Sequence, residues 1–297
     1  MRSLPFDIPD DMPVLIAGPT ASGKSALALE IVERGGGIIV NADALQVYSG
    51  WRILTARPSD DEEARAPHRL YGHVPFDQDY SVGAWLRDIA PFIGKDQPRP
   101  VIVGGTGLYF RALCEGLAEI PPTSTEIRAE ADALLASGGL DTMIAELDVE
   151  SAARIDLQNP VRVQRAWEVL RATGRGIASW QDDTPPPLLP VTDTFPIVMN
   201  TNVDWLNARI EKRFDLMLDG GALEEARMME PHWDPALLSS RAIGAPELMS
   251  YLHANLTLDE ARNAAVISSR QYAKRQRTWF RKRMSGWNIL DLPGESV

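Results

Sequence analysis

Short, uniformly apolar runs alternate with longer mixed segments in the first part of the chain. Residues 13–17 form such a run, and two more follow at residues 38–40 and 101–103. Runs of this length predict strands that are buried on both faces, as in a parallel sheet. The segments between them have helical patterns, and Ser81 is placed to cap one that reaches about Ile93. Strands and helices in this order predict an α/β fold with a parallel sheet.

The middle of the chain has only helical patterns. One predicted helix begins at Thr123 or Ser124, and another runs from Asn159 to Gly174. A linker rich in proline follows, and strand character returns at residues 195–199. We therefore expect an α/β core of the P-loop NTPase-like kind, made of residues 1–118 and 195–297, with an inserted helical domain at residues 119–194.

Composition limits the environment and the partners. With 44 % hydrophobic and 24 % charged residues, the chain is typical of a globular protein. It has no run near the 18 or so apolar residues of a membrane helix and no targeting pattern at its start, so we expect a cytoplasmic protein without membrane association. Cys114 is the only cysteine, which excludes an internal disulfide. For the oligomeric state, which no residue pattern determines, the expectation is a monomer.

One glycine-rich loop carries the clearest chemical signal. It matches the phosphate-binding pattern G-x-x-x-x-G-K-[ST] at every fixed position and lies between a predicted strand and a predicted helix. The N–H groups of such a loop converge on an anion, and Lys24 adds a positive charge. The hydroxyl of Ser25 suits a Mg²⁺ ion that bridges phosphate oxygens. We therefore predict a diphosphate site with Ser25 as the metal ligand, formed by Gly18, Pro19, Thr20, Ala21, Ser22, Gly23, Lys24 and Ser25.

The residues near this loop depart from the usual nucleotide-hydrolysing pattern. In many P-loop NTPases an apolar strand ends in an aspartate that helps to hold magnesium, whereas residues 101–103 lead into two glycines and Thr106. A carboxylate stands elsewhere, because Asp43 follows the apolar run at residues 38–40. Open α/β sheets bind ligands at that end of their strands. Asp43 is thus a candidate proton acceptor beside the phosphates, and its alternative role is to cap a turn.

Several further segments carry specific residues in a fixed order. With the phosphate loop they are residues 18–25, 41–48, 55–57, 103–109, 159–168, 241–244 and 271–279. In this order they resemble the tRNA dimethylallyltransferases, also called tRNA isopentenyltransferases. The resemblance extends from residue 14 to about residue 281, and seven ordered motifs are much more specific than one phosphate loop.

The resemblance implies transfer of a dimethylallyl group from dimethylallyl diphosphate to N6 of adenine 37, next to the anticodon of tRNA. The products would be N6-(dimethylallyl)adenosine and diphosphate. In the family pattern the residue matching Asp43 accepts the amine proton, and the residue matching Thr106 hydrogen-bonds the bridging oxygen of the leaving group. The residue matching Arg241 contacts the diphosphate. The phosphate loop and Mg²⁺ suit the negative charge that develops on this leaving group.

The net charge of −11 would disfavour RNA binding if the charges were evenly spread. A basic segment near the end of the chain shows that they are not. Residues 270–283 contain seven basic residues in fourteen positions and no acidic one. Their spacing puts four of them on one helix face, where we expect contacts with RNA phosphates. These four are Arg270, Lys274, Arg277 and Arg281.

The resemblance adds residues in the insertion and near Asp43 to the expected RNA contacts. The insertion would clasp the anticodon stem, while the reactive base is drawn out of its loop. The pattern of hydrophobic residues gives a different prediction for Trp167, which lies on the apolar stripe of its helix and should be buried. The full expected set is Asp43, Ala44, Leu45, Gln46, Thr106, Arg128, Gln164, Arg165, Ala166, Trp167, Glu168, Lys274, Arg277 and Arg281.

Two other functions fit part of the pattern. A P-loop small-molecule kinase would account for the loop and for Asp43, but not for the strand end that leads into Thr106. A non-catalytic RNA-binding protein would account for the basic segment and would leave Asp43, Thr106 and Arg241 without a role. Replacement of Asp43 by alanine separates this second case, because RNA binding should persist while transfer is lost.

Overall fold

The computed structural model describes residues 6–94 and 96–293, and the chain divides into two compact units. Unit 1 contains residues 1–114 and 188–297, and unit 2 is the segment Glu115–Pro187. The expected boundaries at 119 and 194 therefore differ from those found. Leu189 is buried in the core of unit 1, and its N–H donates to the carbonyl oxygen of Leu113, so the chain re-enters unit 1 before residue 194. Residues 1–5, 95 and 294–297 of the expected core lie outside the described residues.

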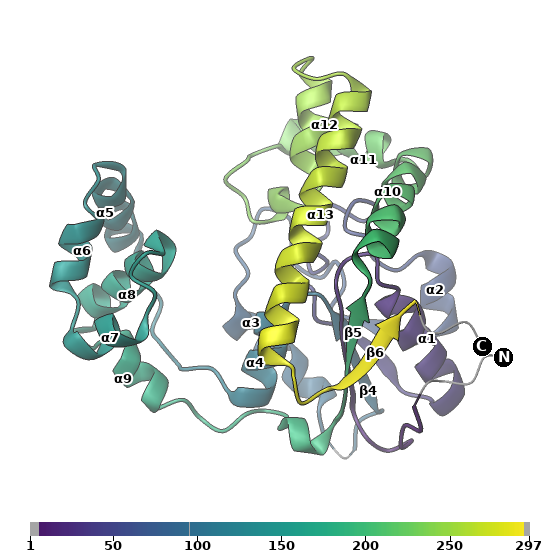
Figure 1. The fold of residues 1–297 in the computed structure, drawn as a ribbon, viewed down its shortest axis with the longest axis horizontal. Helices are drawn as coiled ribbons and strands as arrows, with labels where there is room; N and C mark the ends of the chain where they lie inside the picture. The colour runs from purple at the N-terminus through teal and green to yellow at the C-terminus, as the bar shows by residue number, and fades with distance from the viewer. Residues whose placement is uncertain (1–5, 95, 294–297) are drawn as a thin grey trace. The chain divides into compact units, whose positions relative to one another are not determined.

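Unit 1 is built on a parallel sheet, as Figure 1 shows. Within the described residues the sheet has six strands in the order β3-β2-β4-β1-β5-β6, and each neighbouring pair is parallel. The α/β fold with a parallel sheet is thereby confirmed, although β3 and β6 were not predicted. The strands are β1 (Val14–Ala17), β2 (Ile38–Asn41), β3 (His68–Arg69), β4 (Pro100–Gly104), β5 (Phe195–Thr201) and β6 (Asn288–Leu292).

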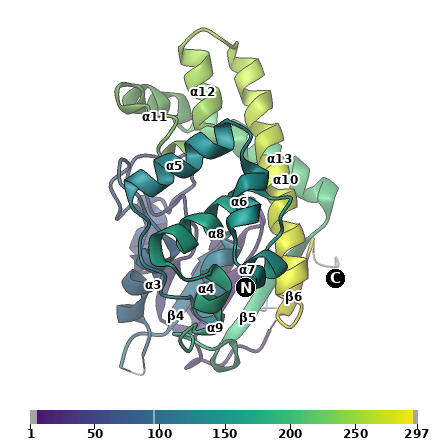
Figure 2. The same cartoon turned by 90° about the vertical axis from the view of Figure 1, so that its left-hand side faces the viewer.

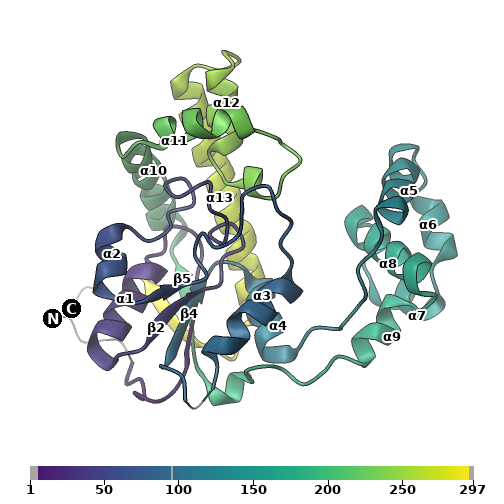
Figure 3. The ribbon, with the colours of Figure 1, turned by 180° about the vertical axis from the view of Figure 1, so that it is seen from behind.

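Helices cover both faces of the central strands, which is why those strands are uniformly apolar (Figures 1 and 3). Successive side chains point to opposite faces. Leu15 and Ile102 pack in the cluster that includes residues of α3 (Val82–Ile89) and α4 (Gly107–Glu115). Val14 and Ile16 pack in the cluster that includes residues of α1 (Lys24–Gly35). The predicted cap of α3 is confirmed, since the hydroxyl of Ser81 accepts the N–H of Ala84 at 3.1 Å.

Residues 203–283 of unit 1 form a helical layer that packs in its own hydrophobic cluster. The longest helix spans 26 residues, and Thr257 and Glu260 form a capping box at its start. No helix in residues 6–94 and 96–293 combines the length and the apolarity that a membrane crossing requires. The helices of this layer are α10 (Val203–Asp219), α11 (Ala222–Met229), α12 (Ala245–Leu252) and α13 (Leu258–Arg283), and the short α2 (Asp60–Arg65) precedes β3.

Unit 2 is wholly helical where it has regular structure, as Figure 2 shows. Its predicted ends are confirmed: the side chains of Ser124 and Asn159 cap two helices, and Gly174 ends the second with a left-handed φ of 67°. The core is small and includes Met143 and Trp167. The helices are α5 (Thr125–Ala136), α6 (Leu140–Glu146), α7 (Val149–Arg154), α8 (Pro160–Thr173) and α9 (Ile177–Asp182).

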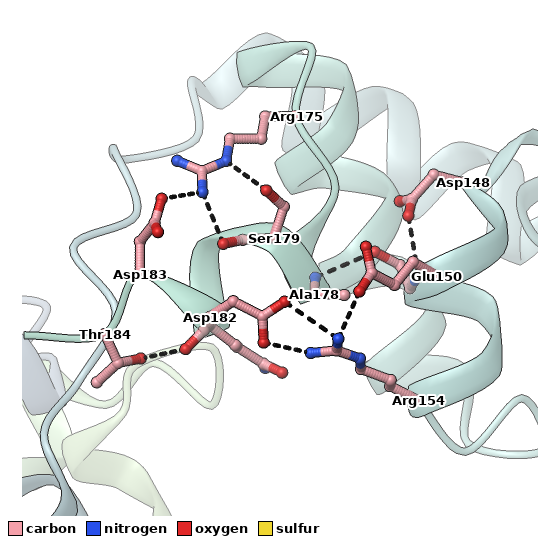
Figure 4. A network of polar contacts seen from close by, with 11 residues as sticks. Asp148, Glu150, Arg154, Arg175, Ala178, Ser179, Asp182, Asp183 and Thr184 are labelled. Carbon is pink, nitrogen blue, oxygen red and sulfur yellow. Dashed lines mark hydrogen bonds and ion pairs between the residues drawn. The ribbon is translucent and has the colours of Figure 1, made fainter.

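Polar contacts link α9 to the rest of unit 2 (Figure 4). Arg154 at the end of α7 donates to Asp182 of α9 at 2.6 Å and also contacts Glu150. The buried hydroxyl of Ser151 accepts the N–H of Ala178 at 3.1 Å. The exposed charges thus surround one buried hydrogen bond.

Candidate active site

A pocket in unit 1 brings the phosphate loop and Asp43 together, as the sequence predicted. Both follow the carboxyl ends of parallel strands, the loop after β1 and Asp43 after β2. The pocket encloses about 650 Å³, including space open to solvent. Its polar and charged lining residues are Thr20, Lys24, Asp43, Gln46, Thr55, Arg213, Ser269 and Tyr272, and its apolar ones are Ala21, Leu45, Leu54, Ile210, Phe214, Met217 and Ile243.

The phosphate loop has the backbone that its motif requires. Gly23 adopts a left-handed φ of 96°, after which α1 begins at Lys24. Lys24 is only 9 % exposed, and its burial lowers the pKa of its ammonium group to about 8. The charge of Asp43 opposes this shift, while Arg213 adds to it. Ser25 is exposed in the first turn of the helix.

Arg213 is a second cation in the pocket, and our sequence analysis did not identify it. Its guanidinium donates to the hydroxyl of Thr20 at 3.1 Å, and burial lowers its pKa. One helical turn earlier, Arg209 donates to the carbonyl oxygen of Ala21 at 2.8 Å. Its position in the chain could have indicated this role. The helix α10 follows β5, and β5 pairs with β1, the strand that leads into the phosphate loop. Two arginines four positions apart at that point reach the loop together.

The carboxylate of Asp43 has one oxygen in a local turn. Asn41 holds the backbone of Asp43 on both sides, with its side-chain oxygen 2.9 Å from the Asp43 N and its Nδ2 3.0 Å from the Asp43 O. Oδ1 of Asp43 accepts the N–H of Leu45 at 3.0 Å, which is the predicted turn-capping role. A Cβ on Gly105 would lie 3.1 Å from Oδ2, so glycine leaves room beside this second oxygen. The same aspartate therefore both caps the turn and lines the pocket.

Thr106 and Gln276 connect the parts of the site. The hydroxyl oxygen of Thr106 accepts the N–H of Ala44 at 2.9 Å, which places it next to the Asp43 turn. Gln276 of α13, which is buried and was not predicted, accepts the N–H of Thr20 at 2.9 Å and donates to the carbonyl oxygen of Gly105 at 2.9 Å. The amide of Gln276 thus fixes the phosphate loop relative to the end of β4.

Arg241, the third expected catalytic residue, lies outside the pocket. It is exposed at the end of a short 3-10 turn, Ser239–Arg241, while Ile243 reaches the pocket wall. The arginine that lines the pocket is Arg213. The contact of Arg241 with diphosphate stays a prediction.

The expected RNA contacts in unit 1 fall into two groups. Leu45 and Gln46 line the pocket, and Ala44 is half-buried beside them. On α13, Lys274 and Arg281 are exposed and Arg277 is half-buried. The fourth basic residue of that face, Arg270, is bound by Glu211 of α10 at 3.0 Å. The basic face is therefore partly neutralised within the protein, and its contact with phosphates stays a prediction.

The expected RNA contacts in unit 2 differ strongly in exposure. Arg128 is exposed, Gln164 donates to Asp132 at 2.7 Å, and Arg165 donates to Thr123 at 2.9 Å. Ala166 and Glu168 are buried. The burial predicted for Trp167 is confirmed, since it is 3 % exposed and donates to Glu146 at 2.7 Å. Its packing holds α8 in place, and direct contacts of these side chains with RNA stay predictions.

A magnesium ion would find few protein ligands here. Within the described residues no group of three or more His, Cys, Asp or Glu side chains is arranged to hold a metal. Magnesium bound through substrate phosphates keeps several waters and needs only one or two protein oxygens. The exposed hydroxyl of Ser25, beside the phosphate loop, fits that type of site.

Comparison with known proteins agrees with the resemblance. Residues 46–283 match the IPP transferase family. The chain is 65 % identical to a tRNA dimethylallyltransferase of Cereibacter sphaeroides, covering 97 % of this chain and 91 % of that protein. It is 61 % identical to the tRNA dimethylallyltransferase of a Ruegeria species, covering 94 % and 96 %. The crystal structure of the full-length tRNA isopentenylpyrophosphate transferase of Bacillus halodurans is similar, with a TM-score of 0.66, 31 % identity, and coverage of 95 % of this chain and 90 % of that one. This chain belongs to the tRNA dimethylallyltransferase, or IPP transferase, family.

Proposed function

We propose that this protein transfers the dimethylallyl group of dimethylallyl diphosphate to N6 of adenine 37 in the anticodon loop of tRNA. The observation that carries the proposal is the content of one pocket: two cations, the buried Lys24 and the half-buried Arg213, share it with the carboxylate of Asp43 and with apolar side chains. An allylic diphosphate has the matching parts, an anionic end and a short hydrocarbon end. Membership in the family supplies the transferred group and the tRNA acceptor.

The cations act on the leaving group. In the transfer the bond between the allylic carbon and the bridging oxygen breaks, and diphosphate leaves with the electron pair. Lys24, Arg213 and the N–H groups of the loop stabilise the charge that gathers on its oxygens. Because Lys24 is already buried and Arg213 is already bonded to Thr20, little reorganisation is needed at that moment. The hydroxyl of Thr106, whose oxygen accepts from Ala44, also interacts with Tyr272 of the pocket, and we assign its hydrogen to the bridging oxygen once the diphosphate is bound.

Asp43 acts on the nucleophile. The N6 amine forms a bond to the allylic carbon and must lose one proton, which the carboxylate accepts. Oδ1 is committed to the N–H of Leu45, so Oδ2 is the oxygen we assign to this step. The products are N6-(dimethylallyl)adenosine and diphosphate. Mg²⁺ held by Ser25 would neutralise part of the diphosphate charge.

The test is transfer of radiolabelled dimethylallyl diphosphate to an unmodified anticodon stem-loop RNA, with and without Mg²⁺, beside an A37→G control. Label in the A37 RNA alone, and its loss in Asp43→Ala with RNA binding retained, would support the proposal. Hydrolysis of ATP, or phosphate transfer from ATP to a small molecule, in place of label transfer would support the P-loop kinase instead. RNA binding without either reaction would indicate a non-catalytic RNA-binding protein.

A further inference from the structure

Glu225 of α11 is a buried carboxylate that the proposed chemistry does not use. It is 5 % exposed and accepts three successive backbone N–H groups. Its Oε1 lies 2.6 Å from the N of Arg52 and 2.8 Å from the N of Ile53, and its Oε2 lies 3.0 Å from the N of Leu54. Hydrogen bonds to a charged acceptor are the strong ones, so Glu225 holds this segment firmly.

The segment held by Glu225 continues into the pocket wall. Leu54 and Thr55 line the pocket, and Ala56 follows with a left-handed φ of 51°. The carbonyl oxygens of Thr55 and Ala56 both accept from Nε2 of Gln46, at 2.9 and 2.8 Å. A side-chain amide has two N–H hydrogens, and both are used by these bonds. The orientation of the Gln46 amide is therefore set by the segment 52–56.

This arrangement gives Gln46 a single role toward a ligand. Gln46 lines the pocket, and with its hydrogens occupied it offers only the acceptor Oε1. The exocyclic amine of adenine is a donor, whereas the oxygen at the same position of guanine is an acceptor. An acceptor held in this orientation favours the adenine and disfavours the guanine.

We propose that Glu225 is a positioning residue for the RNA substrate: it fixes the segment 52–56 and so keeps the Gln46 amide presenting its oxygen to a base amine. The inference rests on the proposed function, since it assumes that the pocket receives a base of RNA. Glu225 does not line the pocket, so its effect passes through Gln46.

The test compares Glu225→Gln with Glu224→Gln. Glu224 is the neighbouring glutamate on α11, is exposed, and pairs with Arg227 at 3.1 Å. In Glu225→Gln one oxygen becomes an NH₂ group that faces backbone N–H donors. We expect kcat/KM for the stem-loop RNA to fall about tenfold or more. The KM for dimethylallyl diphosphate should stay within about threefold, because the segment 52–56 does not hold Lys24 or Arg213. Glu224→Gln should match the wild type in both constants.

A double-mutant cycle separates positioning from general loss of structure. On a Gln46→Met background, Glu225→Gln should cost less than about twofold, because its target is already gone. The same tenfold loss on both backgrounds, an unchanged kcat/KM in Glu225→Gln, or an equal loss in Glu224→Gln would overturn the inference. Glu225→Asp and a thermal midpoint for each variant identify any that fail to fold. If the wild type transfers no label to RNA, the proposed function fails, whereas normal wild-type transfer with an insensitive Glu225 rejects this inference alone.

Discussion

The pocket of unit 1 and the surface of unit 2 hold their arginines in opposite ways. In the pocket, burial lowers the pKa of Arg213, and the neighbouring Lys24 adds a second positive charge. On unit 2, Arg154 is exposed and lies between two carboxylates, and its hydrogen bond with Asp182 raises its pKa (Figure 4). Both residues are arginines on helices, and what distinguishes Arg213 is that its helix follows β5, which pairs with β1.

This difference in burial and in partners indicates which of the two arginine sites is suited to bind an anion. Buried positive charge is unfavourable unless an opposite charge accompanies it. Within the described residues, Asp43 is the only carboxylate whose charge raises the pKa values of both Lys24 and Arg213. A bound diphosphate would complete the neutralisation. The positive charge of Arg154 is already compensated by two exposed carboxylates and screened by water, so its ion pairs contribute little and need no anionic ligand.

The largest expected effect is that of Arg213→Ala. Loss of a preorganised cation beside the leaving group should reduce kcat/KM for dimethylallyl diphosphate by about 100- to 1,000-fold. The measurement is steady-state transfer to stem-loop RNA. Arg65→Ala, which removes an exposed arginine paired with Glu33 at 2.8 Å, is the matched control and should stay within twofold of the wild type. A loss below about threefold in Arg213→Ala would contradict the role we give to this cation of the pocket.

The next effect is a dependence on pH that originates at Lys24. With a pKa of about 8 in the free protein, Lys24 is charged below that value and loses its proton as the pH rises through it. The value of kcat/KM for dimethylallyl diphosphate should therefore be level below pH 8 and decrease above it, approaching about tenfold per pH unit. Lys24→Arg keeps its charge throughout and should remove the decrease. A decrease of the same size in Lys24→Arg would assign it to another group.

The phosphate loop and the position of Asp43 could be predicted because their signals are local. Residues 18–25 carry a complete motif, and Asp43 lies two residues beyond a strand that is buried on both faces. Arg213 and Gln276 could not be predicted in this way, since their bonds to Thr20 cross 193 and 256 positions of sequence. The strand β6 escaped detection for a related reason. It lies at the sheet edge and has exposed residues such as Ile289, so its pattern is not uniformly apolar.

Charges on helices were predicted less well than apolar patterns. The burial of Trp167 followed from its place on an apolar stripe, and the structure agrees. The basic face of α13 also followed from spacing, but spacing could not reveal that Glu211, 59 positions earlier, binds Arg270. An apolar stripe predicts burial whatever covers it, whereas the role of a charge depends on which partner meets it.

The effect of a partner on the role of a charge can be measured on α13, by comparing Arg270 with Arg277 and Arg281. Replacement of Arg277 and Arg281 by alanine should make log K for stem-loop RNA less steep against log salt, by about 0.7 to 0.9 for each lost phosphate contact. Arg270→Ala should change the slope by less than about 0.3, because Glu211 already neutralises Arg270. Binding across a series of KCl concentrations gives the slopes. Equal slopes in the double variant and the wild type would remove the basic face from the RNA interface.

The smallest expected effect is that of Arg154→Ala, which should leave activity within twofold and cost at most about 1 kcal/mol locally, since its ion pairs are exposed. Ser151→Ala is the informative partner. It removes one hydroxyl, but it leaves the N–H of Ala178 buried without its acceptor, at a cost of about 1 to 3 kcal/mol. Hydrogen exchange of the α9 amides reports this local stability directly. We expect faster exchange in Ser151→Ala than in Arg154→Ala. The reverse order would mean that the exposed charges of Arg154 and its partners, and not the buried hydrogen bond of Ser151, hold α9.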